Sequence, residues 1–254
     1  MKSIEADLSG VNTLGELFEL WTEEQERHGS DEQKCAEKVR KSTFPDWKCS
    51  GGRVSGYCPD FYKSFCYDGF LTQRDPGKST ILFICRESNL AAPDDNSHIS
   101  EKKELLPQCP GKENSVENFW MLREFQKKPP KSSYIEWIHT VADDTREYNL
   151  AYMNLNKRGG FGKCNMARIG HYVKLYQRFI CKEIELIAPD IIACGGTFDT
   201  VRGLIAADYF NLLKGMGKEK LICRDFCHPA TPGGIREKKE NAINLVTHQP
   251  VKID

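Results

Sequence analysis

Four short apolar runs, separated by longer segments of mixed character, dominate the pattern of the chain from residue 78 onward. They have the length of buried strands and cover residues 80–85, 149–154, 190–194 and 220–227. The segment 171–188 instead carries one apolar stripe at helical spacing and ends at Pro189. Strands that alternate with helices predict a mainly parallel four-stranded sheet with helices on both faces, an α/β fold of the three-layer α/β/α sandwich type.

The N-terminal part of the chain has a different pattern. Leu14, Leu17, Phe18 and Trp21 fall at helical spacing, and Ser30 begins a segment typical of the cap of a second, charged helix. The segment 44–69 is rich in glycine, cysteine and aromatic residues and shows no clear period. We therefore predict an accessory helical and Cys-rich extension over residues 1–75, followed by an α/β domain over residues 76–254.

Composition narrows the class of protein only slightly. The 254 residues include 36 basic and 36 acidic ones, so the overall charge does not mark a nucleic-acid binder, although it leaves room for a local basic cleft. The chain begins without a signal-peptide pattern and has no run near the roughly 18 apolar residues of a membrane span. We expect a cytoplasmic monomer without a membrane partner, in which the eleven cysteines are reduced thiols or metal ligands.

Polar residues follow each of the four predicted strands. They form the segments 86–89, 154–158, 195–197 and 228–231. Parallel strands bring their carboxyl ends to one edge of a sheet, so this edge gathers a carboxylate, a carboxamide, an imidazole, glycines and two cations. A carboxylate orients water, an imidazole stabilises a leaving anion, and an asparagine reads the edge of a heterocycle, which together suit hydrolysis of a polar bond.

Five motifs in these segments resemble the uracil-DNA glycosylase superfamily, in the same order along roughly residues 78–245. They are Cys85-Arg86-Glu87-Ser88, the Phe-Trp helix motif at 117–125, "YMNLNKRGG" at 152–160, "EIELIAPDIIACGG" at 183–196 and "CHPATPGG" at 227–234. The resemblance implies that Glu87 and His228 are catalytic, Glu87 at the water position and His228 beside the departing base. It implies that Asn154 reads the base, with Ser88 and Asn89 beside it.

The sequence also departs from the family pattern. Cys85 stands where the family usually has glycine, Ser88 where it has proline, Glu87 where Asp or Asn is common, and Ala230 where serine follows the His-Pro pair. A polar insertion at 90–115 lies beside the predicted base pocket. These departures favour a larger or modified base, a pyrimidine, over uracil.

The resemblance therefore implies a monofunctional DNA N-glycosylase that flips out a modified or damaged base and leaves an abasic site. Its role is either DNA repair or defence against phage with modified DNA. Lys157, Arg158, Lys163 and Arg168 are the candidates for phosphate contacts, and Thr231, Ile235 and Arg236 for contacts from the loop after His228, with Ile235 as a wedge in the base stack.

Each assignment has a structural alternative. Glu87 can be a solvated partner of Arg86, Asn154 can cap a turn, and His228 can be an ordinary strand exit. The basic residues near 157–163 can form a solvated loop, and Ile235 can be a packing residue. At the level of function, the alternatives are a non-catalytic module that binds a modified base in DNA and an N-glycosidase that acts on free nucleosides or nucleotides.

The cysteines raise a separate question of a structural metal. The chemistry requires no cofactor, but Cys35, Cys49, Cys58 and Cys66 supply enough thiolates for zinc or an iron-sulfur cluster. Some branches of the superfamily carry a four-iron cluster, and the spacing of Cys164 and Cys181 is similar to their second ligand pair. That similarity permits, as the alternative, a mixed set of Cys58, Cys66, Cys164 and Cys181. Cys85, Cys194 and Cys223 are predicted to be buried small hydrophobic residues.

Overall fold

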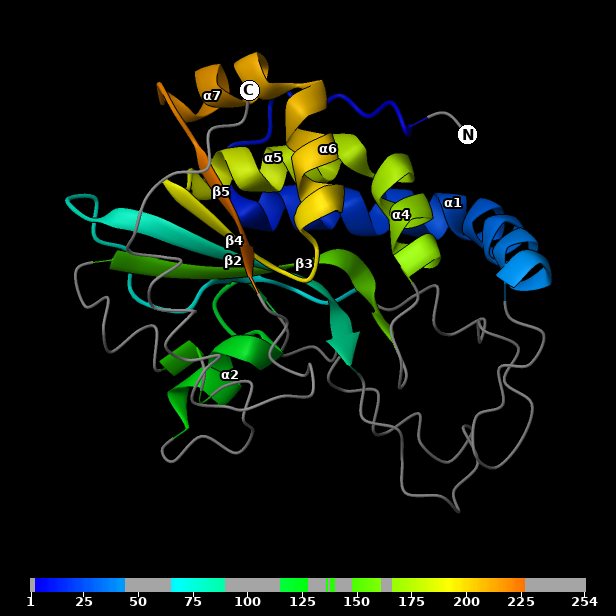
Figure 1. Ribbon diagram of the computed structural model, residues 1–254, viewed down its shortest axis with the longest axis horizontal. Coiled ribbons are helices and arrows are strands. Elements are labelled where there is room, and N and C mark those ends of the chain that lie inside the picture. The colour runs from blue at the N-terminus through cyan, green and yellow to red at the C-terminus, as the bar shows by residue number, and fades with distance from the viewer. Residues whose placement is uncertain are drawn as a thin grey trace.

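The computed structural model is an α/β fold built on a five-stranded mixed sheet (Figure 1). It describes residues 3–43, 65–89, 115–127, 136, 138–139, 148–160 and 166–226. The strands are β1 (Gly69–Phe70), β2 (Ser79–Asn89), β3 (Tyr148–Gly160), β4 (Ile191–Gly195) and β5 (Ile222–Phe226). Their order in the sheet is β1-β3-β2-β4-β5.

The four predicted strands are confirmed, and they are parallel to one another. Their apolar runs made them visible in the sequence, because a strand covered on both faces has no polar side to alternate with. β1 was not predicted. It has two residues, runs antiparallel to β3, and pairs Gly69 with Tyr152 and Phe70 with Ala151.

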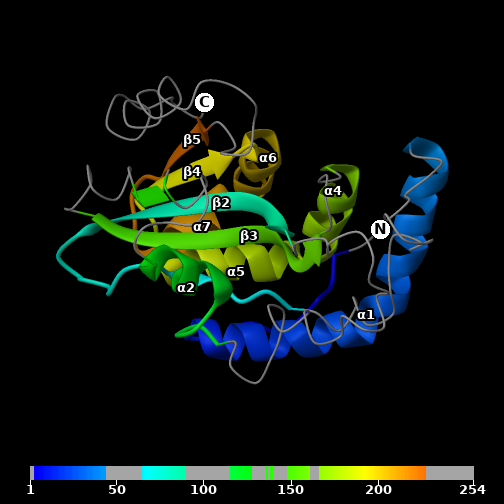
Figure 2. The ribbon, with the colours of Figure 1, turned by 90° about the horizontal axis from the view of Figure 1, so that it is seen from below.

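Helices lie on both faces of the sheet (Figures 1 and 2). One face is covered by α1 (Leu14–Thr43), α4 (Met166–Leu175), α5 (Gln177–Ile187), α6 (Phe198–Ala207) and α7 (Tyr209–Met216). The other face carries α2 (Trp120–Gln126). Each face has its own cluster of buried side chains: Leu82 and Met153 pack toward the larger helical layer, whereas Phe83 and Tyr152 pack toward α2.

The N-terminal helix α1 packs into the same core as the sheet. Leu17, Phe18 and Trp21 of α1 are fully buried in the same cluster as the sheet and α5. The predicted boundary at residue 75 falls between β1 and β2 of one sheet. The second helix expected from Ser30 is not found, because α1 continues through that residue as a single helix of 30 residues.

The segment expected as one helix over 171–188 is divided at Tyr176. α4 ends at Leu175 and α5 begins at Gln177, although the amide of Tyr176 still donates to the carbonyl of Tyr172 at 2.9 Å. The predicted end of the helix is confirmed. Ala188 caps α5 in the left-handed conformation, at φ 50°, directly before Pro189.

A helix that could cross a membrane would have to be both long and apolar, and none of the helices in the described ranges is.

Candidate functional site at the carboxyl edge of the sheet

The carboxyl ends of the parallel strands bring the predicted motifs to one edge. Across β2 and β3, Cys85 lies opposite Asn154 and Glu87 opposite Asn156. β4 and β5 reach the same edge, where Gly195 lies opposite Phe226, two residues before His228. The pairing between β2 and β3 is irregular between Glu87 and Asn89, so the strand bends where the first motif ends.

Arg86 ties the ends of β2 and β4 together. Its Nε donates a hydrogen bond to the carbonyl oxygen of Gly196 at 3.2 Å, and the Thr197 hydroxyl donates to the carbonyl oxygen of Ile84 at 2.8 Å. Gly196 has φ 66°, and a Cβ atom built there would lie 2.6 Å from Nη2 of Arg86. The left-handed backbone conformation at 196 favours glycine, and a Cβ atom there would force the Arg86 guanidinium to shift.

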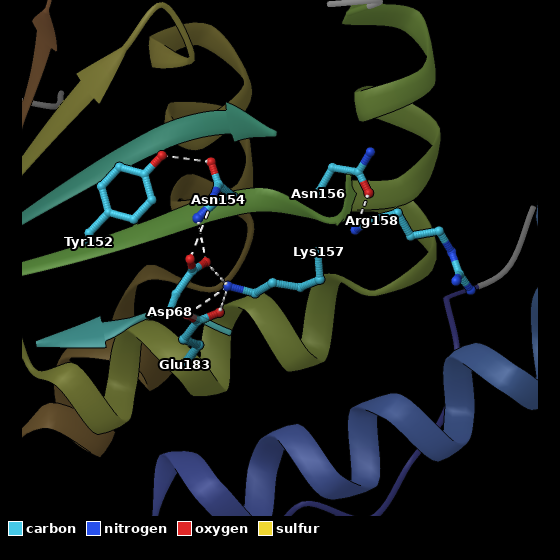
Figure 3. Close-up of polar contacts among 7 residues, drawn as sticks. All are labelled: Asp68, Tyr152, Asn154, Asn156, Lys157, Arg158 and Glu183. Atoms are coloured by element: carbon cyan, nitrogen blue, oxygen red, sulfur yellow. Dashed lines mark hydrogen bonds and ion pairs between the residues drawn. The ribbon is translucent and has the colours of Figure 1, made fainter. Parts of the chain in front are cut away.

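Asn154 lies inside strand β3, and its side chain is almost completely buried (Figure 3). Its Oδ1 accepts a hydrogen bond from the hydroxyl of Tyr152 at 3.0 Å, and its Nδ2 donates to Oδ1 of Asp68 at 3.4 Å. The backbone amide of Asn154 donates to Oδ2 of Asp68 at 2.6 Å. Contacts from two sides thus hold its carboxamide.

The local backbone contact that was considered as an alternative role for Asn154 is made by Asn156. Oδ1 of Asn156 accepts the backbone amide of Arg158 at 3.0 Å, an interaction across two residues of the kind that short polar side chains make at turns. The two asparagines, two positions apart on one strand, therefore differ in function: Asn156 fixes local backbone, while Asn154 joins a network of long-range contacts.

Lys157 and Arg158 are buried, which corrects the expectation that they contact phosphates. The Lys157 ammonium lies 2.5 Å from Oδ2 of Asp68 and 2.8 Å and 2.7 Å from the two oxygens of Glu183 (Figure 3). The Arg158 guanidinium donates to the backbone carbonyl of Gln25 at 3.0 Å. Their position directly after a strand suggested exposure, but β3 continues to Gly160 and carries both side chains into the interior.

Aromatic rings enclose the Lys157 ammonium on the remaining side. It lies 5.3 Å from the ring centroids of both Phe18 and Trp21 in α1, within the range of cation–π attraction. Two buried carboxyls and one buried cation therefore meet between α1, α5 and the sheet.

Burial shifts the protonation of both carboxyls in this cluster. Desolvation raises the pKa of Glu183 to about 8, against the opposing effect of the Lys157 ammonium. Desolvation also raises the pKa of Asp68, while Lys157 and the two donors of Asn154 oppose that rise. Asp68 has more donors to stabilise its charge, so we assign the negative charge to Asp68 and a proton to Glu183 at neutral pH.

Sequence reasoning missed Asp68 and Glu183. Glu183 left a signal, because it falls within the apolar stripe of α5 and is buried beside Ile180, Ile184 and Ile187. Asp68 left none, since it precedes a two-residue strand whose conformation depends on pairing with β3.

The cysteine assignments are resolved in part. Cys85, Cys194 and Cys223 are buried, which confirms the prediction for them. Cys66 is disulfide-bonded, a form in which its sulfur is not the thiolate that a metal site needs, and its assignment as a ligand of the reduced protein stays a prediction. Cys181 is a free thiol whose pKa is raised to about 12, chiefly by burial and further by Asp208 and Glu185.

The other proposed metal ligands are not placed. Cys49, Cys58 and Cys164 lie outside the described residues, and Cys35 lies in α1 without a described side chain. Within the described ranges, no group of three or more His, Cys, Asp or Glu side chains is arranged to hold a metal ion.

Several other predicted site residues are placed only by their backbone or not at all. Glu87, Ser88 and Asn89 end β2 and Arg168 lies in the first turn of α4, but their side chains are not among the described ones. His228 and the remaining loop candidates Lys163, Thr231, Ile235 and Arg236 lie outside the described residues. Phe119 is fully buried at the start of α2.

Comparisons with family models, with curated proteins and with solved structures find no match to this chain. The resemblance to the uracil-DNA glycosylase superfamily therefore stays a prediction that rests on the five motifs and on their order.

Proposed function

We propose that this protein is a DNA N-glycosylase that removes a modified base, a pyrimidine derivative, and leaves an abasic site. The proposal includes a three-layer α/β/α arrangement, with the substrate at the carboxyl edge of the sheet. DNA is the partner, and the reaction needs no cofactor. A cluster of cysteines in the N-terminal part remains a separate candidate for a structural metal.

The observation that supports the proposal is the register of β2 against β3. It brings the backbone of Glu87 next to Asn156 and one pair away from Asn154, so the first two motifs meet at one edge although they are about 70 positions apart in the chain. β5 ends at the same edge two residues before His228. Ligand sites of parallel sheets form at this edge.

The proposed reaction is hydrolysis of the bond between C1′ of the sugar and the base nitrogen. The nucleotide leaves the base stack, and Asn154 hydrogen-bonds to the edge of the flipped base. The base departs with the bonding electron pair, stabilised by a hydrogen bond from His228. Glu87 stabilises the cationic sugar and orients the water, whose oxygen bonds to C1′; one proton of the water passes to the departed base and the other stays on the new C1′ hydroxyl.

The test is mass spectrometry of bases released from a panel of DNAs that contain uracil, deaminated purines, hydroxymethylated bases or glucosylated bases. We expect the native protein to release one modified base from this panel. Glu87→Gln and His228→Ala should each reduce the rate by at least about a hundredfold, because each removes a group that acts in the transition state.

Glu219→Gln is the matched control for Glu87→Gln, because Glu219 is an exposed glutamate after α7, outside the proposed site. It should release the base at the native rate. Tight binding to one modified DNA without release from any DNA would contradict the glycosylase and favour the binding module. Release from free nucleosides but not from DNA would favour the nucleosidase.

A further inference from the structure

We infer that Asp68 is a positioning residue that fixes the orientation of the Asn154 carboxamide for base recognition. The inference rests on the proposed function and adds to it a residue outside all five motifs. It is carried by the contacts among Asp68, Asn154 and Tyr152, which come from the segment before β1 and from β3 (Figure 3).

The contacts distinguish the two ends of the carboxamide. An ionised carboxylate can only accept hydrogen bonds, so the amide end of Asn154, which lies 3.4 Å from Oδ1 of Asp68, is its donor end. The Tyr152 hydroxyl donates to the oxygen end at 3.0 Å. A half-turn of the carboxamide would set its oxygen against the Asp68 carboxylate, and this repulsion in a buried site makes the turned orientation unfavourable.

Asp68 is itself held in place from two directions. Its Oδ2 accepts the backbone amide of Asn154 at 2.6 Å, which fixes it to the strand that carries the side chain it orients. The Lys157 ammonium, 2.5 Å away, provides the compensating charge for a carboxylate that is only 1 % exposed. Glu183, in α5, contacts the same ammonium. The charge on Asp68 therefore depends on which of the two carboxyls carries a proton and on how they share the Lys157 cation.

A fixed carboxamide is useful because a base edge is read by the order of its donors and acceptors. An asparagine that can turn over accepts either order, whereas one held by Asp68 accepts a single order. Asp68 should therefore contribute mainly to discrimination between bases. Binding to DNA phosphates should not depend on it.

The experiment measures discrimination by binding in the Glu87→Gln background, which removes turnover. The readout is the ratio of Kd values for DNA without and with the base that the native protein releases. Asp68→Asn supplies both a donor and an acceptor of the same size and no longer enforces one orientation. We expect it to reduce the ratio about tenfold, the value of one well-made hydrogen bond.

A double-mutant cycle separates positioning from a general structural role. Asn154→Ala should reduce the ratio by at least as much as Asp68→Asn. Adding Asp68→Asn to Asn154→Ala should then change it less than twofold, because Asp68 acts through Asn154. An unchanged ratio in Asp68→Asn, or effects that multiply in the double variant, would overturn the inference.

Two further points guard the experiment against a variant that fails to fold. In Asp68→Asn, Glu183 can release its proton and pair with Lys157, so the cluster keeps a neutral total charge. If thermal melting nevertheless shows that this variant is unfolded, Tyr152→Phe carries the test in the same cycle, because it removes the hydroxyl that donates to the oxygen end of Asn154. A native protein that releases no base would defeat the proposed function and the inference together, whereas release with a failed cycle would defeat the inference alone.

Discussion

At the scale of single residues, the cluster of Asp68, Lys157 and Glu183 has the largest consequences. All three side chains are at most 1 % exposed, so solvent does not screen their charges. One cation between two carboxyls leaves one excess negative charge, which a proton on Glu183 removes. The stability of the fold is therefore linked to pH through a group far from the surface.

The first prediction concerns that linkage. Glu183 has a pKa of about 8 in the folded protein and an ordinary value of 4.5, so the folded state binds more protons than the unfolded state between these values. The stabilising effect is fully present below pH 4.5 and is lost as the pH rises through about 8. We expect Glu183→Gln to flatten the decline of the free energy of unfolding between pH 5 and 8.5, measured by urea denaturation.

Glu185→Gln is the control on the same helix, because Glu185 is partly exposed and pairs with Lys182. It should keep the native pH profile. A Glu183→Gln protein whose pH profile matches that of the native protein would show that Glu183 is ionised at neutral pH.

The second prediction concerns the cation. Lys157→Met keeps most of the side-chain volume but leaves two buried carboxyls without a positive partner. We expect a loss of about 3–5 kcal/mol in the free energy of unfolding, the usual cost of removing one member of a buried ion pair. Adding Asp68→Asn should recover part of the loss, and a loss below about 1 kcal/mol would mean that water reaches the cluster.

At the scale of elements, the sequence pattern predicted those strands and helix ends that depend on neighbouring residues in the chain. The four parallel strands were found because each is an apolar run, and the end of α5 because proline cannot continue a helix. The pattern predicted neither β1 nor the continuity of α1. β1 has two residues and depends on its pairing with β3. The site followed the same rule: Asn154 was found at its strand, while its partner Asp68 depends on a contact 86 positions away.

The third prediction belongs to the cap of α5. Ala188 adopts φ 50°, where its Cβ crowds the backbone, and Pro189 restricts it further. Ala188→Gly should stabilise the protein by about 0.5–1 kcal/mol, because relief of the left-handed strain exceeds the added entropy of the unfolded chain. Urea denaturation measures the change, and Ala207→Gly, inside the last turn of α6, should instead destabilise.

At the scale of the whole molecule, the N-terminal helix and the sheet share one hydrophobic core. Trp21 stacks on Phe179 of α5 at 5.3 Å between ring centroids, and Phe18 and Trp21 cover the Lys157 ammonium. Sequence reasoning treated residues 1–75 as an extension, because its periodicity does not show what its apolar face contacts.

The fourth prediction tests whether the sheet folds without α1. A chain that begins at residue 65 keeps β1 to β5 but loses α1, and so exposes α5 and the buried cation to solvent. We expect it to lack a cooperative thermal transition in circular dichroism and to aggregate in size-exclusion chromatography. A truncated chain that melts cooperatively as a monomer would show that the α/β part folds alone.

The position of Asp68 also affects how this sheet meets other chains. Along the outer side of β3, the amide of Leu71 donates to the carbonyl of Leu150, β1 pairs with Ala151 and Tyr152, the Asp68 carboxylate accepts the amide of Asn154, and the amide of Cys66 donates to the carbonyl of Lys157. A side chain thus stands where a neighbouring strand would place a carbonyl. A strand from another molecule could pair with this side of β3 only by displacing β1 and a buried charge, so β3 itself is protected from the strand-to-strand association that leads to amyloid.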